Sequence, residues 1–267
     1  MIDYRPERIV CLTEESTEFL YLLGEQDRIV GISGFTVRPE QARKEKPKVS
    51  LFTEASIDKI VALNLDLVIG FSDIQAEIAS KLIKRGVNVW VSNQRSIGEI
   101  MAYLIQVGSW VGKQKEATHL VECYLKRLEE IRSITHAWEK RPKVYFEEWF
   151  DPLISGISWV SELIEIAGGD ECFKHLSKAS LAKDRIIARH EEVIEANPDV
   201  IMASWCGKMF KKKKMLAREG WGQIKAVQDD QIFEIDSAII LQPGPAALTE
   251  GVEAIFGHLK KWQSTQV

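Results

Sequence analysis

Two segments of this chain repeat one pattern, and that repeat constrains the fold more than any other feature. IDKIVALNLDLVIGFS at 57–72 aligns with HEEVIEANPDVIMASW at 190–205, a constant offset of 190 − 57 = 133 residues. In each segment an apolar pair ends a short helix, an Asn and an Asp mark a tight turn, and an apolar run follows as a buried strand. The alternative is convergence on a common helix–turn–strand unit. A true repeat predicts two similar halves.

The first half of the chain alternates short apolar runs with helical patterns. Gly24 and Gly86 follow the two clearest helical patterns and would end those helices. Strands separated by helices in short units predict a parallel sheet covered on both faces. The expected strands are 8–12, 28–33, 66–70 and 87–92, and the expected helices between them are 16–23 and 73–85.

The middle of the chain, from 96 to 140, has no strand pattern. After Gly112 the apolar positions keep a helical period as far as Trp138, and Pro142 ends the run. This period predicts one long helix of roughly 25 residues, preceded by a shorter one; two ordinary core helices are the alternative. Strand and helix signals then resume at 143–147, 159–167, 200–204, 232–235 and 245–260.

We therefore expect an α/β protein with two Rossmann-like lobes that have parallel sheets and are joined by one long interdomain α-helix. The expected division is an N-terminal lobe at 1–108, the connecting helix at 109–141 and a C-terminal lobe at 142–267. In open parallel sheets, ligands bind outside the carboxyl ends of the strands. Both copies of the repeat place a loop directly after a strand, so we expect these loops to face a shared cleft.

Composition excludes several classes of function. Lys and Arg total 35 against 39 Asp and Glu, so the net charge of −4 offers no global field for nucleic acid. The apolar runs are far shorter than the ~20 residues that cross a bilayer, so we expect no membrane span. The chain shows no secretory leader, and its four cysteines lie far apart. We therefore expect a cytoplasmic protein; a periplasmic or other extracytoplasmic location is the alternative if a leader preceded Met1.

The common motifs of enzymes are absent. There is no GxGxxG after a strand, no GxxxxGK[ST], no HExxH and no GxSxG. We expect no catalytic residue, no required cofactor and no enzymatic activity. The five histidines are scattered, mostly over predicted helices, and we expect no metal site. Cys206, in a Gly-flanked loop, has two interpretations: a nucleophile or metal ligand, or a small packing side chain, which is favoured.

Aromatic residues gather at strand ends and in loops. Large rigid faces at such places suit stacking on a bulky planar ligand, and the alternative is that several of them close the core of their own lobe. For Trp205, at the end of an apolar strand, the cleft is favoured. Glu147 and Glu148 would point to opposite faces of a strand, which argues against a paired acid–base role. The aromatic residues are Phe35, Phe52, Phe71, Trp149, Phe150, Trp159 and Trp205.

Six motifs in a fixed order resemble those of one family: RIVCLTEESTEFLYLLG, DRIVGISGF, SIDKIVALNLDLVIG, NPDVIMASW, SELIEIAGGDECF and LQPGPAALTEGVEAI. From Arg8 to Leu259 the chain is similar to the helical-backbone (class III) substrate-binding proteins of ABC transporters, of the vitamin B12-binding, BtuF-like type. The resemblance implies two α/β lobes joined by one long helix, with a ligand held between them. Metal-binding relatives carry histidines and carboxylates in the ligand loops, and haem-binding ones a Tyr or His. The resemblance therefore favours a corrinoid, cobalamin-like ligand here.

The resemblance also implies which residues touch the ligand. They fall in the loops after the predicted strands of both halves: Thr13, Glu14, Glu15, Phe35, Thr36, Phe52, Phe71, Ser72, Trp149, Ser204, Trp205 and Cys206.

Docking on an ABC permease is a further implication of the resemblance. Relatives present one acidic residue on each lobe to permease arginines, and Glu77 matches on the first lobe. The second lobe instead carries Lys211 to Lys214, whose ammonium groups would repel arginines, and this argues against docking. We therefore expect a monomeric, non-enzymatic corrinoid-binding protein. The alternatives are an extracytoplasmic component of an importer for B12, haem or an iron–siderophore, and a thiol enzyme or redox sensor that uses Cys206.

Overall fold

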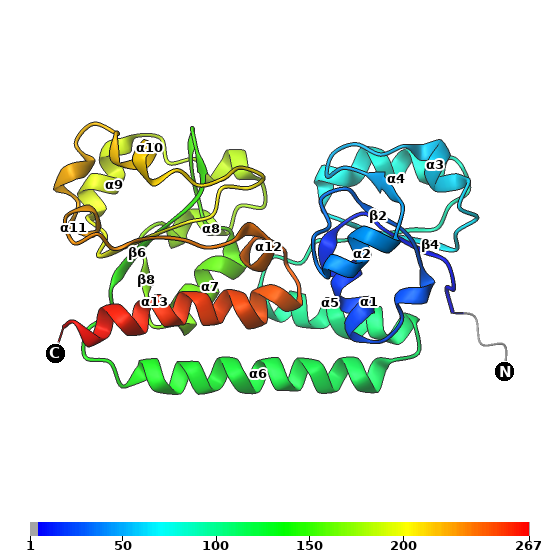
Figure 1. Cartoon of the computed structure of the whole chain (residues 1–267), viewed down its shortest axis with the longest axis horizontal. Coiled ribbons are helices and arrows are strands. Elements are labelled where there is room, and N and C mark those ends of the chain that lie inside the picture. Colours follow the sequence, from blue (N-terminus) through cyan, green and yellow to red (C-terminus); the bar gives the residue numbers. More distant parts are fainter. Residues whose placement is uncertain (1–4, 267) are drawn as a thin grey trace. The chain divides into compact units, whose positions relative to one another are not determined.

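The structure is a computed structural model that describes residues 5–266, and its internal contacts divide the chain into two compact units. The first unit comprises Met1–Gln94 and Gly98–Cys123, and the second comprises Arg95–Ile97 and Tyr124–Val267. The long helix α6 (Gln114–His136), green in Figure 1, begins in the first unit and ends in the second. Its 23 residues confirm the prediction of one long helix. The predicted boundaries at 108 and 141 stay a prediction.

The first unit contains a five-stranded sheet in the order β3-β2-β1-β4-β5, with every neighbouring pair parallel. This confirms the parallel α/β sheet expected from the alternation of strands and helices. The short strand β3 was not foreseen, because three residues are too few to show a period. The strands are β1 (Ile9–Cys11), β2 (Ile29–Ser33), β3 (Lys48–Ser50), β4 (Leu67–Phe71) and β5 (Val89–Ser92).

Helices connect these strands. Gly24 and Gly86 take positive φ angles of 72° and 77° just after α1 and α4, as expected of helix-ending glycines. The predicted helix at 73–85 is a 3₁₀ turn followed by an α-helix. The helical segments that belong wholly or mainly to this unit are α1 (Glu14–Leu22), η1 (Gln26–Arg28), α2 (Glu40–Glu45), α3 (Ile57–Val61), η2 (Asp73–Gln75), α4 (Ala76–Ile83) and α5 (Ile97–Trp110).

The second unit contains a mixed sheet in the order β10-β9-β6-β7, with β8 paired to β6. Strand β7 runs antiparallel to β6, whereas β8, β9 and β10 pair in parallel. The expected sheet was wholly parallel. Only two residues separate β6 from β7, which permits a hairpin but not the crossover that a parallel neighbour needs. The strands are β6 (Lys143–Phe150), β7 (Leu153–Ser155), β8 (Asp170–Glu171), β9 (Val200–Ala203) and β10 (Ile232–Glu234).

Many short helices surround this second sheet. Most of them escaped prediction because a helix of four or five residues shows little periodicity. The final helix, expected at 245–260, starts with a π-helical turn. The helical segments are α7 (Ser158–Ile166), α8 (Lys174–Ser177), η3 (Ala182–Arg185), α9 (His190–Ala196), α10 (Lys212–Leu216), η4 (Trp221–Gln223), α11 (Lys225–Gln228), α12 (Ser237–Ile240), the π-helix η5 (Ala247–Gly251) and α13 (Val252–Ser264).

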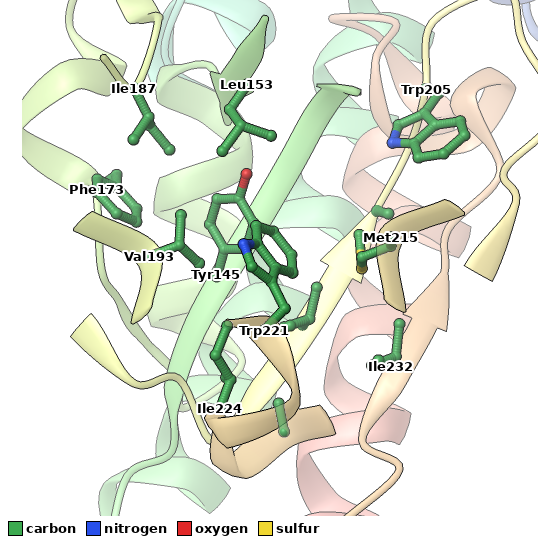
Figure 2. Close-up of a cluster of buried hydrophobic side chains, with 13 residues drawn as sticks. Tyr145, Leu153, Phe173, Ile187, Val193, Trp205, Met215, Trp221, Ile224 and Ile232 are labelled. Carbon is green, nitrogen blue, oxygen red and sulfur yellow. The ribbon is translucent and has the colours of Figure 1, made fainter. Parts of the chain in front are cut away.

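A buried hydrophobic cluster of the second unit includes four aromatic side chains, Tyr145, Phe173, Trp205 and Trp221 (Figure 2). Tyr145 makes edge-to-face contacts with Trp221 and Phe173, at centroid distances of 6.1 and 5.6 Å. Such pairs add to the stabilisation that comes from burying the rings themselves. Trp205 belongs to the same buried cluster, as Figure 2 shows.

The two copies of the sequence repeat form the same kind of turn before a strand, one copy in each unit. Asn64 and Asn197 both take the left-handed conformation, with φ of 47° and 45°, and turn the chain from a short helix toward β4 or β9. Asp66 then accepts a hydrogen bond from the Arg8 amide at 2.9 Å, and Asp199 accepts one from the Lys143 amide at 2.9 Å. Each Asp therefore fastens its turn to the start of the neighbouring strand.

Candidate functional site

The predicted ligand residues of the first half lie in four loops at one edge of the first sheet. Thr13 follows β1, Phe35 and Thr36 follow β2, Phe52 follows β3, and Phe71 and Ser72 end or follow β4. Since these strands are parallel, their carboxyl ends meet at one edge, which we call the first carboxyl edge. The fold therefore brings these residues to the same edge, where ligands bind in open α/β sheets.

Two buried carboxyl groups stand at the first carboxyl edge, in the first turn of α1. Glu14 is 4 % exposed and Glu15 is 1 % exposed. Thr13 Oγ1 donates a hydrogen bond to Glu15 Oε1 at 2.6 Å, but Glu14 Oε1 and Glu15 Oε2 accept none within residues 5–266. Burial raises the pKa of Glu14 to about 8 and the pKa of Glu15 to about 7. Both groups are therefore poised to donate or accept a hydrogen bond near neutral pH.

Other side chains at this edge divide into exposed aromatic surface and buried polar atoms. Phe35 is 55 % exposed and Phe52 is half-buried, so both present ring surface. Phe71, in contrast, is buried. Thr36 is fully buried, yet its hydroxyl has no hydrogen-bond partner within residues 5–266. A buried polar atom without a partner is costly, which makes this edge favourable for a ligand that supplies the missing bonds.

Gln75 was missed by the sequence analysis and ties three of the four loops together. Its Oε1 accepts a hydrogen bond from the Phe71 amide at 2.9 Å. Its Nε2 donates to the Leu12 carbonyl at 3.3 Å and to the Phe52 carbonyl at 3.0 Å. A Cβ at Gly70 would lie 2.9 Å from Gln75 Oε1, so that glycine leaves room for the amide. The glycine inside an apolar strand was the available signal of a close approach.

The candidate residues of the second half lie at the carboxyl ends of β6 and β9, which we call the second carboxyl edge. Ser204, Trp205 and Cys206 follow β9, and Trp149 is the penultimate residue of β6. Trp205 is 4 % exposed and packs against Phe150 and Phe210, so most of its indole is core of its own unit. It also contributes to the lining of a pocket of about 540 Å³ with Lys208 and Met209.

Glu147 holds neighbouring side chains of the second carboxyl edge in place through hydrogen bonds. It is fully buried, and its carboxylate accepts hydrogen bonds from Arg218 at 2.5 and 3.1 Å, from Trp205 Nε1 at 2.8 Å and from the Tyr145 hydroxyl at 3.0 Å. Its neighbour Glu148 instead pairs with buried Arg185 at 2.6 and 2.8 Å. The two carboxylates are thus engaged in separate ion pairs, as their opposite directions on a strand suggested.

The remaining candidate residues at this edge, Trp149, Ser204 and Cys206, differ in exposure and in their hydrogen-bond partners. Trp149 donates from Nε1 to the Asp151 carbonyl at 2.9 Å, and Lys208 Nζ lies 4.4 Å from its ring centroid. Ser204 is buried, and its hydroxyl has no partner within residues 5–266. Cys206 is exposed, but the surrounding protein and then the Glu148 carboxylate hold the pKa of its thiol above the ordinary value. A raised pKa disfavours the thiolate that a nucleophile needs.

Metal-ligand clusters and membrane-spanning helices are both absent from the described residues. Within residues 5–266, no group of three or more His, Cys, Asp and Glu side chains is arranged to hold a metal ion. Across the same residues, no helix joins enough length to enough apolar character for a bilayer crossing.

The two α/β units each carry a parallel-strand carboxyl edge, and α6 is divided between them. The family model described as periplasmic binding protein matches residues 9–239, and the chain belongs to that family.

Curated relatives extend the match to nearly the whole chain. An uncharacterized ABC transporter substrate-binding lipoprotein, YvrC of Bacillus subtilis (strain 168), is 25% identical over 264 residues, 95% of this chain and 80% of the relative. A vitamin B12-binding protein of Vibrio campbellii is 25% identical over 89% of this chain and 84% of its own length.

Solved structures confirm the fold. The periplasmic vitamin B12 binding protein BtuF of Vibrio cholerae matches with a TM-score of 0.77 and 22% identity, covering 97% of this chain and 98% of that chain. The periplasmic heme-binding protein RhuT from Roseiflexus sp. RS-1 matches with a TM-score of 0.80 and 22% identity, over 95% and 99%. The resemblance inferred from the motifs is therefore confirmed.

The predicted cytoplasmic location is wrong. The matched family is that of periplasmic binding proteins, and the Bacillus relative is a lipoprotein. The prediction rested on the start of the chain, which lies partly outside the described residues, and on unpaired cysteines. Neither feature reports the compartment: free thiols are also compatible with a fold whose core is large enough to need no disulfide.

Proposed function

We propose that this chain is the non-enzymatic, extracytoplasmic ligand-binding component of an ABC importer and that it binds a corrinoid. The observation that carries the proposal is the similarity to vitamin B12-binding proteins over about nine-tenths of the chain, together with its membership of the periplasmic binding protein family. Binding, not chemistry, is the work of such a protein. The absent enzyme motifs and the raised pKa of the Cys206 thiol support this.

Each carboxyl edge, taken by itself, carries groups suited to a corrinoid. Phe35 and Phe52 offer ring surface to a large macrocycle, and Trp149 does so on the second unit. Glu14, Glu15, Thr36 and Ser204 carry buried oxygen atoms without partners within residues 5–266, suited to the amide groups around a corrin ring. No His or Tyr is among the proposed contacts, which favours a corrinoid over haem, whose iron takes such axial ligands.

Isothermal titration with cyanocobalamin, cobinamide and haem tests the ligand. We expect 1:1 binding of the two corrinoids. Phe35→Ala should weaken that binding roughly 10-fold, since truncating an aromatic contact commonly costs over 1 kcal/mol. Ile134→Ala, at an exposed apolar position on α6, is the matched control and should leave affinity unchanged. Binding of haem without corrinoid binding would reject the ligand and retain the protein class.

Docking on an ABC permease is a separate part of the proposed function and has its own test. The Glu77 side chain is 91% exposed and lies 3.8 Å from Lys81 Nζ, so an arginine of a partner could reach it. On the second unit Lys212 is engaged by Asp230 at 2.6 Å, and Lys214 lies 5.1 Å from the Phe150 ring centroid. Co-purification with a candidate ABC permease that presents arginines at its docking surface should weaken for Glu77→Lys and improve for Lys211→Glu.

A further inference from the structure

The outer face of α6 carries a histidine and a cysteine one helical turn apart. His119 and Cys123 are both exposed, and His119 Nε2 lies 3.9 Å from Cys123 Sγ. Both belong to the part of α6 that lies in the first unit. Residues at i and i+4 share one helix face, so the helix itself holds the two groups together. From the sequence, no metal site was expected, because the histidines are scattered along the chain.

The spacing of the two atoms suits a shared metal ion. With Zn–S near 2.3 Å and Zn–N near 2.0–2.1 Å, bond angles of roughly 105–125° at the metal would separate the two ligand atoms by about 3.5–3.9 Å. The observed separation lies at the upper end of that range, and a small rotamer change closes it. Thiolate and imidazole are the ligands that Zn²⁺ and related borderline-soft ions select.

The surroundings of the pair leave a metal ion room to bind. The buried side chains of α6 nearest the pair in sequence are Ala117, Val121 and Tyr124, which helical spacing places on the opposite face. Neither His119 nor Cys123 is therefore needed for the core. A single chain supplies two ligands here, and water can complete the tetrahedral shell that Zn²⁺ prefers.

From these contacts we propose that His119 and Cys123 form a two-ligand surface site for Zn²⁺ or a similar divalent transition metal. The site lies on α6, outside the loops that form the first carboxyl edge, and does not rest on the proposed corrinoid binding. Within residues 5–266, Cys123 is the cysteine that lies beside a histidine side chain. Loading requires the thiolate and the neutral imidazole, so metal binding releases protons.

Titration of the reduced protein with Co²⁺, a spectroscopic substitute for Zn²⁺, tests the site. We expect a thiolate-to-cobalt absorption band that saturates at one ion per chain and that Zn²⁺ abolishes by displacement. Losing even an outer-shell partner of a metal ligand costs roughly 10- to 100-fold in affinity, so His119→Ala and Cys123→Ser should each weaken binding at least 10-fold. The band itself should vanish in Cys123→Ser.

Two control variants test whether Co²⁺ binds at this pair and not at another exposed histidine or thiol. His136→Ala removes the exposed histidine at the far end of the same helix, and Cys206→Ser removes an exposed thiol of the second unit; both should bind Co²⁺ like the parent protein. Because His119 and Cys123 are exposed, their variants should keep the parent's circular dichroism spectrum. A band that persists in Cys123→Ser, or one that is lost only in Cys206→Ser, would overturn the proposal.

Discussion

At the first carboxyl edge Glu14 and Glu15 are buried with one oxygen atom each that accepts no hydrogen bond within residues 5–266. At the second, Glu147 is buried just as deeply but accepts four hydrogen bonds, two of them from Arg218. Partnered buried charges rigidify their surroundings, whereas unpartnered polar atoms are costly until something binds them. The comparison indicates that the charged groups of the second edge are already paired, whereas the first edge holds more of the unpartnered buried oxygen atoms: Glu14, Glu15 and Thr36 there against Ser204 at the second edge, counted within residues 5–266.

The largest expected effect comes from breaking the ion pair of the second unit. Arg218→Met keeps much of the side-chain length but leaves the Glu147 carboxylate buried without its cation. We expect the free energy of unfolding to fall by about 3–5 kcal/mol, the usual cost of orphaning one member of a buried pair. Urea denaturation followed by tryptophan fluorescence measures this, since Trp205 and Trp221 lie in the affected core.

An exposed ion pair of the same unit provides the control. Arg189 lies 3.7 Å from Glu192 with 61% of its side chain exposed, and Arg189→Met should cost at most about 1 kcal/mol. Equal effects of the two substitutions would mean that Glu147 is not buried as a charged group, and the contrast between the two edges would then be lost.

The second expected effect sharpens the comparison through pH. The pKa of Glu14 is about 8 in the folded protein against an ordinary value of 4.5, so the folded state holds this proton more tightly than the unfolded chain. As pH rises from 4.5 to 8, the unfolded state loses the proton first, and the free energy of unfolding falls. Glu14→Gln removes this loss and should be more stable than the parent by on the order of 2 kcal/mol at pH 8, with no difference near pH 4.

Glu40 offers a matched control for this pH dependence. It lies in the first turn of α2, is largely exposed and pairs with Lys44 at 2.5 Å. Glu40→Gln should leave the slope of stability against pH unchanged. If Glu14→Gln behaved in the same way, the carboxyl group would have to be ionised and solvated in the folded protein, and the first edge would resemble an ordinary helix start.

The main helices and strands of this molecule could be predicted from its sequence. The hydrogen-bond partners of its side chains could not. The period of α6 and the repeat at Asn64 and Asn197 are local patterns, so both could be predicted. The roles of Gln75 and Arg218 could not, because each reaches residues that are distant in the chain: Gln75 bonds to Leu12, and Arg218 bonds to Glu147, 71 positions away. Trp205 shows the same limit, since its position after β9 could be predicted but the direction of its indole could not.

The smallest expected effect tests what the two units share. Asp66 and Asp199 occupy matching positions of the repeat, and each accepts a backbone amide at the start of β1 or β6. Asp66→Ala and Asp199→Ala should therefore each lower the free energy of unfolding by about 1–2 kcal/mol, because either change leaves amide groups without their acceptor. Asp58→Ala, which removes only an exposed pair with Arg85, should change it by less than about 0.5 kcal/mol. Similar losses at the two repeat positions would support the same role for both Asp side chains, which is to hold the backbone at the start of a strand. A loss at only one position would mean that the sequence repeat is a coincidence.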